Sequence, residues 1–433
     1  MSFATLGLSP ALLRAVREQG YHAPTAIQSQ AIPAILSGAD VLGLAQTGSG
    51  KTAAYALPLL QQVLRQRQQQ GRSTQRLPLA LILVPTRELA AQVGQSLHEL
   101  ADFLPGPLKI SIAFGGVSIN PQLMGLRGGT DIVVATPGRL LDLLEHRGLS
   151  LGAIECLVLD EADRLLDLGF AEELQRLLAG LPGRRQNLFF SATFPKAVEA
   201  LAQALLREPT RIEIAAEPAR VAAITQRALV VDEGRRTALL RHLLAEEGWT
   251  RVLVFVATKY ATEHVSDKLW KAGIKAAALH GELSQGGRTG VLNALKSGEI
   301  QVLVATDVAA RGLDIPELPV VLNYDLPRSA TDYTHRIGRT GRAGQTGLAL
   351  SFISGQLGNG EAHFRLIEKR QGQRVAREQI AGFEPSSLAS AEAGVGGVKG
   401  RRKSKKDKLR EAAAAAAASA GSAESSGPVD ENN

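Results

Sequence analysis

Residues 45 to 52 read AQTGSGKT. A short apolar run at residues 41–44 precedes this stretch, and residues 53–64 have a helical pattern. Glycines at a strand-to-helix turn, followed by Lys-Thr, are typical of a phosphate-binding loop. Gly48 and Gly50 would let the chain turn tightly, so that backbone N–H groups and the helix N-terminus face phosphate oxygens. The stretch therefore predicts an α/β domain that binds a nucleotide.

The loop residues would hold ATP and Mg²⁺, the two predicted cofactors. We expect Lys51 to reach the β- and γ-phosphates and Thr52 to be a ligand of Mg²⁺. The other loop residues would surround the phosphates, namely Ala45, Gln46, Thr47, Gly48, Ser49 and Gly50. The strict motif has glycine where this chain has Ala45, so a Gly/Ser turn beside an unrelated lysine is the alternative.

Short apolar runs recur along the chain and are separated by helix-length segments. They lie at residues 79–84, 109–113, 131–135, 156–159 and 187–190, and again at 228–231, 252–256, 275–279, 301–305, 320–323 and 348–353. Continuous Val, Ile and Leu runs that alternate with helices predict parallel sheets covered on both faces. We therefore predict two α/β domains, at residues 1–214 and 224–356, joined by a linker at 215–223. Because the second domain has no phosphate loop of its own, it would complete a site that the first begins.

Length and composition fit a globular chain. The 433 residues are 45% hydrophobic, and the apolar runs are about as long as strands, too short to span a membrane. The only cysteine, Cys156, cannot form a disulfide within the chain, and the start of the chain lacks the charged and apolar regions of a signal peptide. We therefore expect a soluble, cytoplasmic protein.

The excess of positive charge lies near the C-terminus. The net charge is +7, and residues 399–410 alone hold eight basic side chains and one acidic one. We expect a helix around residues 362–376 within a C-terminal extension at 357–385. Residues 386–433 are rich in Ser, Ala, Gly and Lys, which predicts a disordered tail. This tail would tether nucleic acid, or alternatively only keep the chain soluble.

The tetrapeptide DEAD at residues 160–163 directly follows the apolar run 156–159. Ligand-binding groups of open α/β sheets collect beyond the carboxyl ends of strands. Asp160 can hold Mg²⁺, and Glu161 can accept a proton from the water that attacks the γ-phosphate. The alternative is a solvated acidic turn that caps the next helix, but a buried strand and a phosphate loop in the same domain favour the catalytic interpretation.

With these motifs in place, the chain resembles the DEAD-box RNA helicases of superfamily 2 over about residues 3 to 353. The stretches FGGVSINPQ, LRGG and HGELSQGGRT resemble the bacterial RhlE-type subgroup. The resemblance implies two tandem RecA-like domains. It also implies that Phe3 stacks on adenine, that Gln28 of GYHAPTAIQ bonds the edge of the base, and that Asp314 of ATDVAARGLDI contacts the ribose.

The same resemblance assigns roles to further residues. Those expected to bind the RNA backbone are Arg87, Gly116, Thr136, Arg139, Gln285, Arg288 and Thr306. Those expected to couple hydrolysis to strand separation are Asp163, Ser191, Thr193 and His335. The stretch HRIGRTGRAG would supply Arg339 and Arg342 as arginine fingers. Their three-residue spacing would place both guanidiniums on one face of a helical turn, although a solvated basic helix end is the alternative.

The resulting hypothesis is an RNA-stimulated ATPase whose domains close on ATP and RNA and separate short RNA duplexes. RNA would be recognised with little sequence selectivity, because backbone and 2′-OH contacts carry little base information. We expect a monomer that acts in RNA remodelling such as ribosome assembly or RNA turnover, with protein partners from those processes. An ATP-gated RNA clamp or annealing chaperone is the alternative, and a DNA translocase is disfavoured by the motif around Gln28.

Overall fold

The computed structural model describes residues 2–46, 48–70, 76–214, 224–310, 318–341, 346–354 and 359–386. Several predictions concern residues outside these ranges, namely Thr47, Asp314, Arg342, the linker 215–223 and the tail from residue 387 onward.

The first sheet has seven parallel strands in the order β3-β4-β2-β5-β6-β1-β7. Their bounds are Val41–Leu44 for β1, Ala80–Leu83 for β2, Ile110–Ala113 for β3, Ile132–Ala135 for β4, Cys156–Leu159 for β5, Gln186–Ser191 for β6 and Thr210–Glu213 for β7. Every residue of β1, β2, β4 and β5 is buried, as a sheet with two covered faces requires. The predicted parallel sheet is confirmed. Strand β7 was not predicted, because only Ile212 of this edge strand is buried.

Helices cover both faces of this sheet. They are α1 (Pro10–Glu18), α2 (Ala26–Leu36), α3 (Lys51–Gln70), α4 (Arg87–Ala101), α5 (Asn120–Leu126), α6 (Pro137–Glu145), α7 (Ala162–Asp167), α8 (Ala171–Ala179) and α9 (Lys196–Leu205). Successive side chains of each strand point to opposite faces of the sheet, so the apolar side chains form two cores, one on each face. Ile82 and Val158 pack with residues of α1 to α4, whereas Leu81 packs with residues of α6 to α9.

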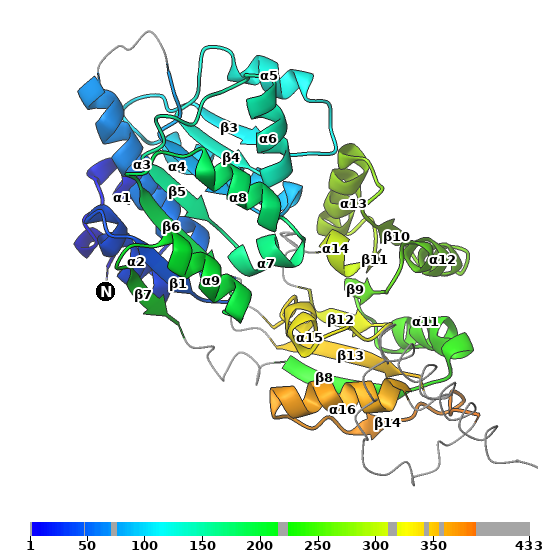
Figure 1. Ribbon diagram of the computed structural model, residues 1–433. Helices are drawn as coiled ribbons and strands as arrows, with labels where there is room; N and C mark the ends of the chain where they lie inside the picture. Colours follow the sequence, from blue (N-terminus) through cyan, green and yellow to red (C-terminus); the bar gives the residue numbers. More distant parts are fainter. Residues whose placement is uncertain are drawn as a thin grey trace, which may run out of the picture.

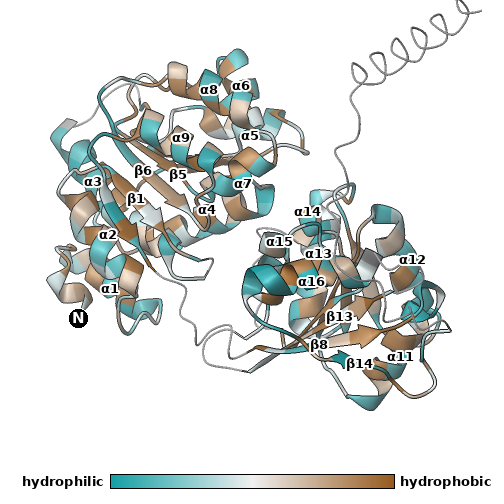
Figure 2. Ribbon diagram, turned by 60° about the horizontal axis from the view of Figure 1, so that its bottom comes forward, coloured by the Kyte–Doolittle hydropathy of each residue, from teal (hydrophilic) through white to brown (hydrophobic). Residues whose placement is uncertain are grey.

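The second sheet repeats the arrangement, with seven parallel strands in the order β10-β11-β9-β12-β13-β8-β14. The strand bounds are Ile224–Val230 for β8, Val252–Phe255 for β9, Ala276–Leu279 for β10, Val302–Ala305 for β11, Val320–Asn323 for β12, Gly347–Ile353 for β13 and Arg377–Glu378 for β14. The helices are α11 (Arg236–Glu246), α12 (Lys259–Trp270), α13 (Gln285–Ser297), α14 (Asp307–Ala310), α15 (Ala330–Ile337) and α16 (Asn359–Gln371). Figures 1 and 2 show the two α/β units, each with hydrophobic strands between partly hydrophilic helices.

The segment after β13 is part of the second α/β unit. The helix predicted around residues 362–376 is present as α16, which begins three residues and ends five residues earlier. Strand β14 pairs with β8 in parallel. Ile380 and Phe383 pack against the apolar core of the second unit. A two-residue strand of sequence Arg-Glu has no apolar pattern, so the sequence did not predict β14. Among the helices within the described ranges, none is both long and apolar enough to cross a membrane.

Candidate nucleotide and RNA site

The predicted phosphate loop connects β1 to α3, which begins at Lys51. Gly48 and Gly50 have φ angles of 79° and 90°, a left-handed conformation that side chains other than glycine rarely adopt. Lys51 is only 6% exposed, and its Nζ donates to the carbonyl oxygen of Ala45 at 2.7 Å. The ammonium group therefore lies against the start of the same loop. A lysine and backbone N–H groups in this arrangement fit a phosphate group.

Gln28, on α2, forms a hydrogen bond with this loop. Its Oε1 accepts from the backbone N–H of Thr25 at 2.9 Å, and its Nε2 donates to the carbonyl oxygen of Gly50 at 3.2 Å. A Cβ at residue 50 would lie 2.5 Å from Gln28 Nε2, so this position needs glycine for space as well as for φ. Phe3 is buried in the core of the first unit. The adenine contacts of Phe3 and Gln28 stay predictions, and the contact between Gln28 and the loop was not foreseen.

Asp160 lies at the carboxyl end of β5 and is 2% exposed. Burial and the nearby charge of Glu161 raise the pKa of Asp160 to about 6, although Lys51 opposes the shift. The Tyr55 hydroxyl donates to Asp160 Oδ2 and the Glu161 backbone N–H to Oδ1, both at 2.9 Å. A buried carboxylate with a raised pKa gains from a nearby cation. The oxygens of Asp160 and Thr52 have the hard character that Mg²⁺ prefers, so these residues fit a Mg²⁺ ion beside the phosphate loop.

Glu161 stands at the N-terminal end of α7 in a strained conformation. Its φ and ψ are both 51°, which is unusual for a residue other than glycine and typical of functional sites. Its carboxylate is buried, and Oε2 forms an ion pair with Arg164 Nη1 at 3.1 Å. Arg164 therefore fixes the orientation of Glu161, a role that the sequence does not predict.

The predicted coupling residues lie together. Thr193 donates to Asp163 Oδ2 from its backbone N–H at 3.0 Å and from its hydroxyl at 2.7 Å, and the Asp163 backbone N–H donates to Ser191 Oγ at 3.3 Å. Burial alone would raise the pKa of Asp163, but the hydrogen bonds from Thr193 and Ser191 outweigh it and lower the pKa. Asp163 is thus held ionised between α7 and the end of β6.

His335 brings the second unit to this cluster. It lies on α15, and Asp163 and Arg164 of α7 contribute to its electrostatic environment. Burial and the positive charge of Arg164 lower the pKa of His335 to about 4, so the imidazole is neutral at pH 7. Arg339 follows α15 closely and is also buried. The acidic motif of the first unit therefore meets the motif that the sequence predicted to supply arginine fingers (Figure 1).

A second contact between the two units lies among the predicted RNA-binding residues. Arg288 Nε and Glu88 Oε1 are 2.7 Å apart, and the two side chains are only 3% and 8% exposed. Arg288 also donates to the carbonyl oxygens of His280 and Ala309, at 3.3 and 3.2 Å. Glu88 had no predicted role, because its partner is 200 residues away in the chain.

The other predicted RNA-binding residues lie at helix starts beyond the strands. Thr136 precedes α6, Gln285 begins α13, and Thr306 caps α14 by accepting from the Ala309 N–H at 3.4 Å. Arg139 donates through Nη2 to the carbonyl oxygen of Val117 at 2.8 Å. Arg139 Nη1 and Gln285 Oε1 are buried and have no hydrogen-bond partner within the described part of the chain. Such atoms are suited to contact a ligand.

Gly116 and Arg87 pack closely. Gly116 has a φ of 76°, and a Cβ there would lie 2.1 Å from Arg87 Nη1. Glycine at this position therefore gives the Arg87 guanidinium its space beside Glu88 and Arg288, the residues of the ion pair between the units. The predicted contacts of Arg87 and Gly116 with RNA stay predictions.

Comparisons with known proteins agree with this geometry. The family model described as DEAD/DEAH box helicase matches residues 25–201, and the helicase conserved C-terminal domain matches residues 235–344. The chain is 43% identical over 384 residues to the ATP-dependent RNA helicase DeaD of Mycobacterium tuberculosis, covering 88% of this chain and 66% of that relative. It is 41% identical over 391 residues to the ATP-dependent rRNA helicase RRP3 of Gibberella zeae, covering 88% and 78%. The chain thus spans just under two thirds of the DeaD relative.

A solved structure shares the arrangement of both units. Dbp5 of S. cerevisiae bound to RNA and ADP BeF3 is similar with a TM-score of 0.75 and 31% sequence identity, over 87% of this chain and 95% of that one. The fold is thus that of tandem RecA-like domains, as the sequence predicted. The RhlE-type subgroup is not confirmed by these similarities. The chain belongs to the DEAD-box family of ATP-dependent RNA helicases.

Proposed function

We propose that this chain hydrolyses ATP when RNA draws its two RecA-like domains together, and that this closure separates short RNA duplexes locally. One observation carries the proposal: the acidic motif of the first domain and α15 of the second meet around Asp163 and His335. A site assembled from both domains is complete only while they are in contact. Its activity then depends on whatever holds the domains together.

Residues of both domains have separate parts in hydrolysis. Lys51 and the loop N–H groups would hold the phosphates, and Glu161 would accept a proton from the attacking water. Mg²⁺, when bound beside Asp160 and Thr52, would neutralise charge on the phosphate oxygens. Arg339 would approach the γ-phosphate from the second domain, as would Arg342, which lies outside the described residues. Such a finger stabilises the charge of the transition state.

RNA would lie across both domains, along the helix starts that carry Arg139 and Gln285. These residues would contact phosphates and sugars, which favours RNA over DNA with little dependence on sequence. Some relatives are named rRNA helicases, which supports a role in RNA remodelling such as ribosome assembly or RNA turnover. We propose that the protein acts in the cytoplasm as a monomer, together with protein partners from these processes.

Unwinding can be distinguished from clamping with a short labelled RNA duplex. The duplex is incubated with the protein and ATP, with an excess of unlabelled trap strand. Release of the labelled strand that requires ATP hydrolysis supports the helicase function. Stable retention of intact duplex, with ATP binding but no strand release, would instead show the alternative, an ATP-gated RNA clamp.

The buried ion pair between the domains gives a prediction about closure. Glu88→Gln should weaken ATP-dependent RNA binding by about 10-fold or more, because it leaves the Arg288 guanidinium buried beside a neutral amide. RNA half-saturation of the ATPase measures the effect. Glu99→Gln is the matched control, because Glu99 lies on the same helix and accepts from Gln95 within the first domain. Equal RNA half-saturation for both variants would show that the ion pair does not support closure.

A second prediction concerns pH. Burial and the positive charge of Arg164 in the first domain lower the pKa of His335 to about 4 from its ordinary value near 6.5. Opening the domains would remove the charge of Arg164, so the closed arrangement binds fewer protons than the open one. Closure is therefore fully favoured above about pH 6.5 and is progressively lost as the pH falls from there toward 4. We expect RNA half-saturation to rise over this interval.

The variant His335→Gln isolates this effect. Its amide cannot take up a proton in this range, so its pH profile between 5 and 6.5 should be flatter than that of the wild type. Any titration of Asp160, whose pKa is about 6, affects both proteins equally. Identical slopes for the two proteins would contradict the proposed place of His335 in the closed site.

A further inference from the structure

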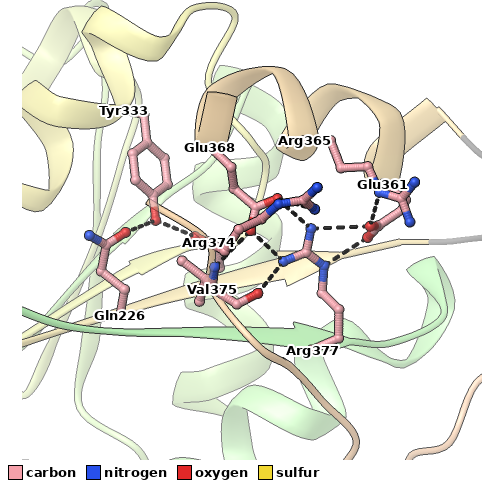
Figure 3. A network of polar contacts seen from close by, with 9 residues as sticks. Gln226, Tyr333, Glu361, Arg365, Glu368, Arg374, Val375 and Arg377 are labelled. Carbon is pink, nitrogen blue, oxygen red and sulfur yellow. Dashed lines mark hydrogen bonds and ion pairs between the residues drawn. The ribbon is translucent and has the colours of Figure 1, made fainter. Parts of the chain in front are cut away.

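Helix α16 and strand β14 lie beyond the helicase C-terminal family match, which ends at residue 344. No predicted motif includes them. Nevertheless α16 packs directly on α15, the helix that carries His335 and leads to Arg339, and β14 pairs with β8 beside it. Figure 3 shows the polar contacts of Arg377 with Glu361 and Glu368 of α16, and the bond between Tyr333 of α15 and Gln226.

Arg377 of β14 is the centre of these contacts. Its guanidinium bonds both oxygens of Glu368, from Nη1 to Oε1 at 2.9 Å and from Nη2 to Oε2 at 3.0 Å, and its Nε bonds Glu361 Oε2 at 2.9 Å. Glu368 is 3% exposed and also accepts from the backbone N–H of Val375 at 2.8 Å. Burial alone would raise the pKa of Glu368, but its bonds with Arg377 outweigh burial and lower it. A bidentate pair of this kind, with a buried carboxylate, fixes both partners in one geometry.

The aromatic rings of Phe364 and Tyr333 connect the Arg377 guanidinium to α15. Arg377 Cζ lies 4.8 Å from the centre of the Phe364 ring, and the Phe364 ring meets Tyr333 edge-on at 5.7 Å. Both rings are fully buried. One further bond connects the same helices, because Gln371 Nε2 donates to Thr334 Oγ1 at 3.3 Å. In addition, His363 Nε2 of α16 lies 2.6 Å from the carbonyl oxygen of Pro327, in the segment before α15.

From Tyr333 the contacts continue toward the RNA-binding edge. Ser351 Oγ lies 3.5 Å from the Tyr333 hydroxyl, and it accepts from Asn323 Nδ2 at 3.2 Å. Asn323 Oδ1 accepts from Arg336 Nη1 at 3.0 Å. Arg336, on α15, then holds both oxygens of Asp307 at 2.6 and 2.7 Å. Asp307 directly follows Thr306, a predicted RNA contact.

We propose that α16 and β14 are a positioning element for the composite ATP site, and that Arg377, Phe364 and Tyr333 set where α15 presents His335 and Arg339 to the first domain. Helix α15 has only eight residues, and an isolated helix of that length is not stable in water. Its position is therefore set by packing, and α16 supplies a large part of that packing. Because a finger acts only at the correct distance, a small shift of α15 lowers the rate of the chemical step.

This inference rests on the proposed function, since the test reads RNA-stimulated hydrolysis of ATP. With saturating polyuridylate, Arg377→Ala should lower kcat by about 10-fold or more, because a displacement of about 1 Å at a catalytic group costs up to about 100-fold. The KM for ATP should stay within about twofold of the wild-type value, because the nucleotide is held by the first domain. A loss confined to kcat separates positioning from general damage.

Two variants of the same segment control the experiment. Arg374→Ala also removes an arginine beside Glu368, but Arg374 is 82% exposed and lies 3.8 Å from that carboxylate, so kcat should not change. Arg377→Lys keeps the positive charge that Arg377→Ala removes, but it cannot form the bidentate pair with Glu368. This variant should therefore recover part of the kcat that Arg377→Ala loses.

Phe364→Leu tests the same inference if Arg377→Ala does not fold. It removes the ring that lies between Arg377 and Tyr333 and keeps an apolar side chain in the core. A lower kcat at unchanged KM supports the inference. A wild-type kcat for a folded Phe364→Leu, or for a folded Arg377→Ala, overturns it. Absence of RNA stimulation in the wild-type protein would instead overturn the proposed function itself.

Discussion

ATP turnover of the Glu161→Gln variant should fall by about 10²- to 10⁴-fold, the usual contribution of a general base, while ATP affinity stays near the wild-type value. Glutamine keeps the size of the side chain but cannot accept a proton from water. The residues that hold the phosphates, including Lys51, are unchanged. The closed complex should therefore form and persist, with a longer lifetime on RNA.

Loss of ATP turnover with unchanged ATP binding would identify Glu161 as the general base. ATP binding is measured with a fluorescent analogue, turnover by phosphate release, and complex lifetime by dissociation of labelled RNA. Glu172→Gln on α8 is the control, because Glu172 is exposed and its substitution should change none of the three. Turnover near the wild-type rate in Glu161→Gln would show that another group activates the water.

Arg339→Ala should lower RNA-stimulated ATP hydrolysis by about 10³- to 10⁵-fold, the range expected for an arginine finger. Arg339 is buried and acts on the electrostatic environment of His335, as Asp163 and Arg164 of α7 also do, so Arg339 lies near the contact with α7. ATP affinity without RNA should be unchanged, because the binding loop belongs to the first domain.

The comparison for this variant is Arg328→Ala. Arg328 is an exposed arginine two residues before α15, so its loss should leave the rate unchanged. If the full-length Arg339→Ala protein hydrolysed ATP at the wild-type rate with RNA, Arg339 would not be an arginine finger. ATP hydrolysis at the first domain would then not depend on Arg339.

The sequence predicted the sheets well because strands buried on both faces must be continuously apolar. The run at residues 156–159 matches β5 residue for residue. Strands β7 and β14 were missed because these two edge strands have no apolar run, with one buried residue in β7 and none in β14. Strand β14 in addition is only two charged residues long, and the ion pairs of Arg377 stabilise it in place of an apolar pattern.

The candidate site was predicted where its residues lie in one short motif. The loop around Lys51 and the pair Asp160 and Glu161 are of this kind. Tyr55 and Glu88 were missed because their partners lie 105 and 200 positions away, so only tertiary structure reveals the contact. A weak signal existed for Tyr55, since it is one helical turn from Thr52 and therefore on the same face of α3.

The rate of ATP hydrolysis by the full-length protein, measured with and without RNA, tests the central claim most directly. Saturating single-stranded RNA should raise kcat strongly, and DNA of the same sequence should have little effect, because the proposed two-domain site would be complete only when RNA spans both domains. Equal rates with and without RNA would contradict the account, because they would show that the first domain hydrolyses ATP without the second.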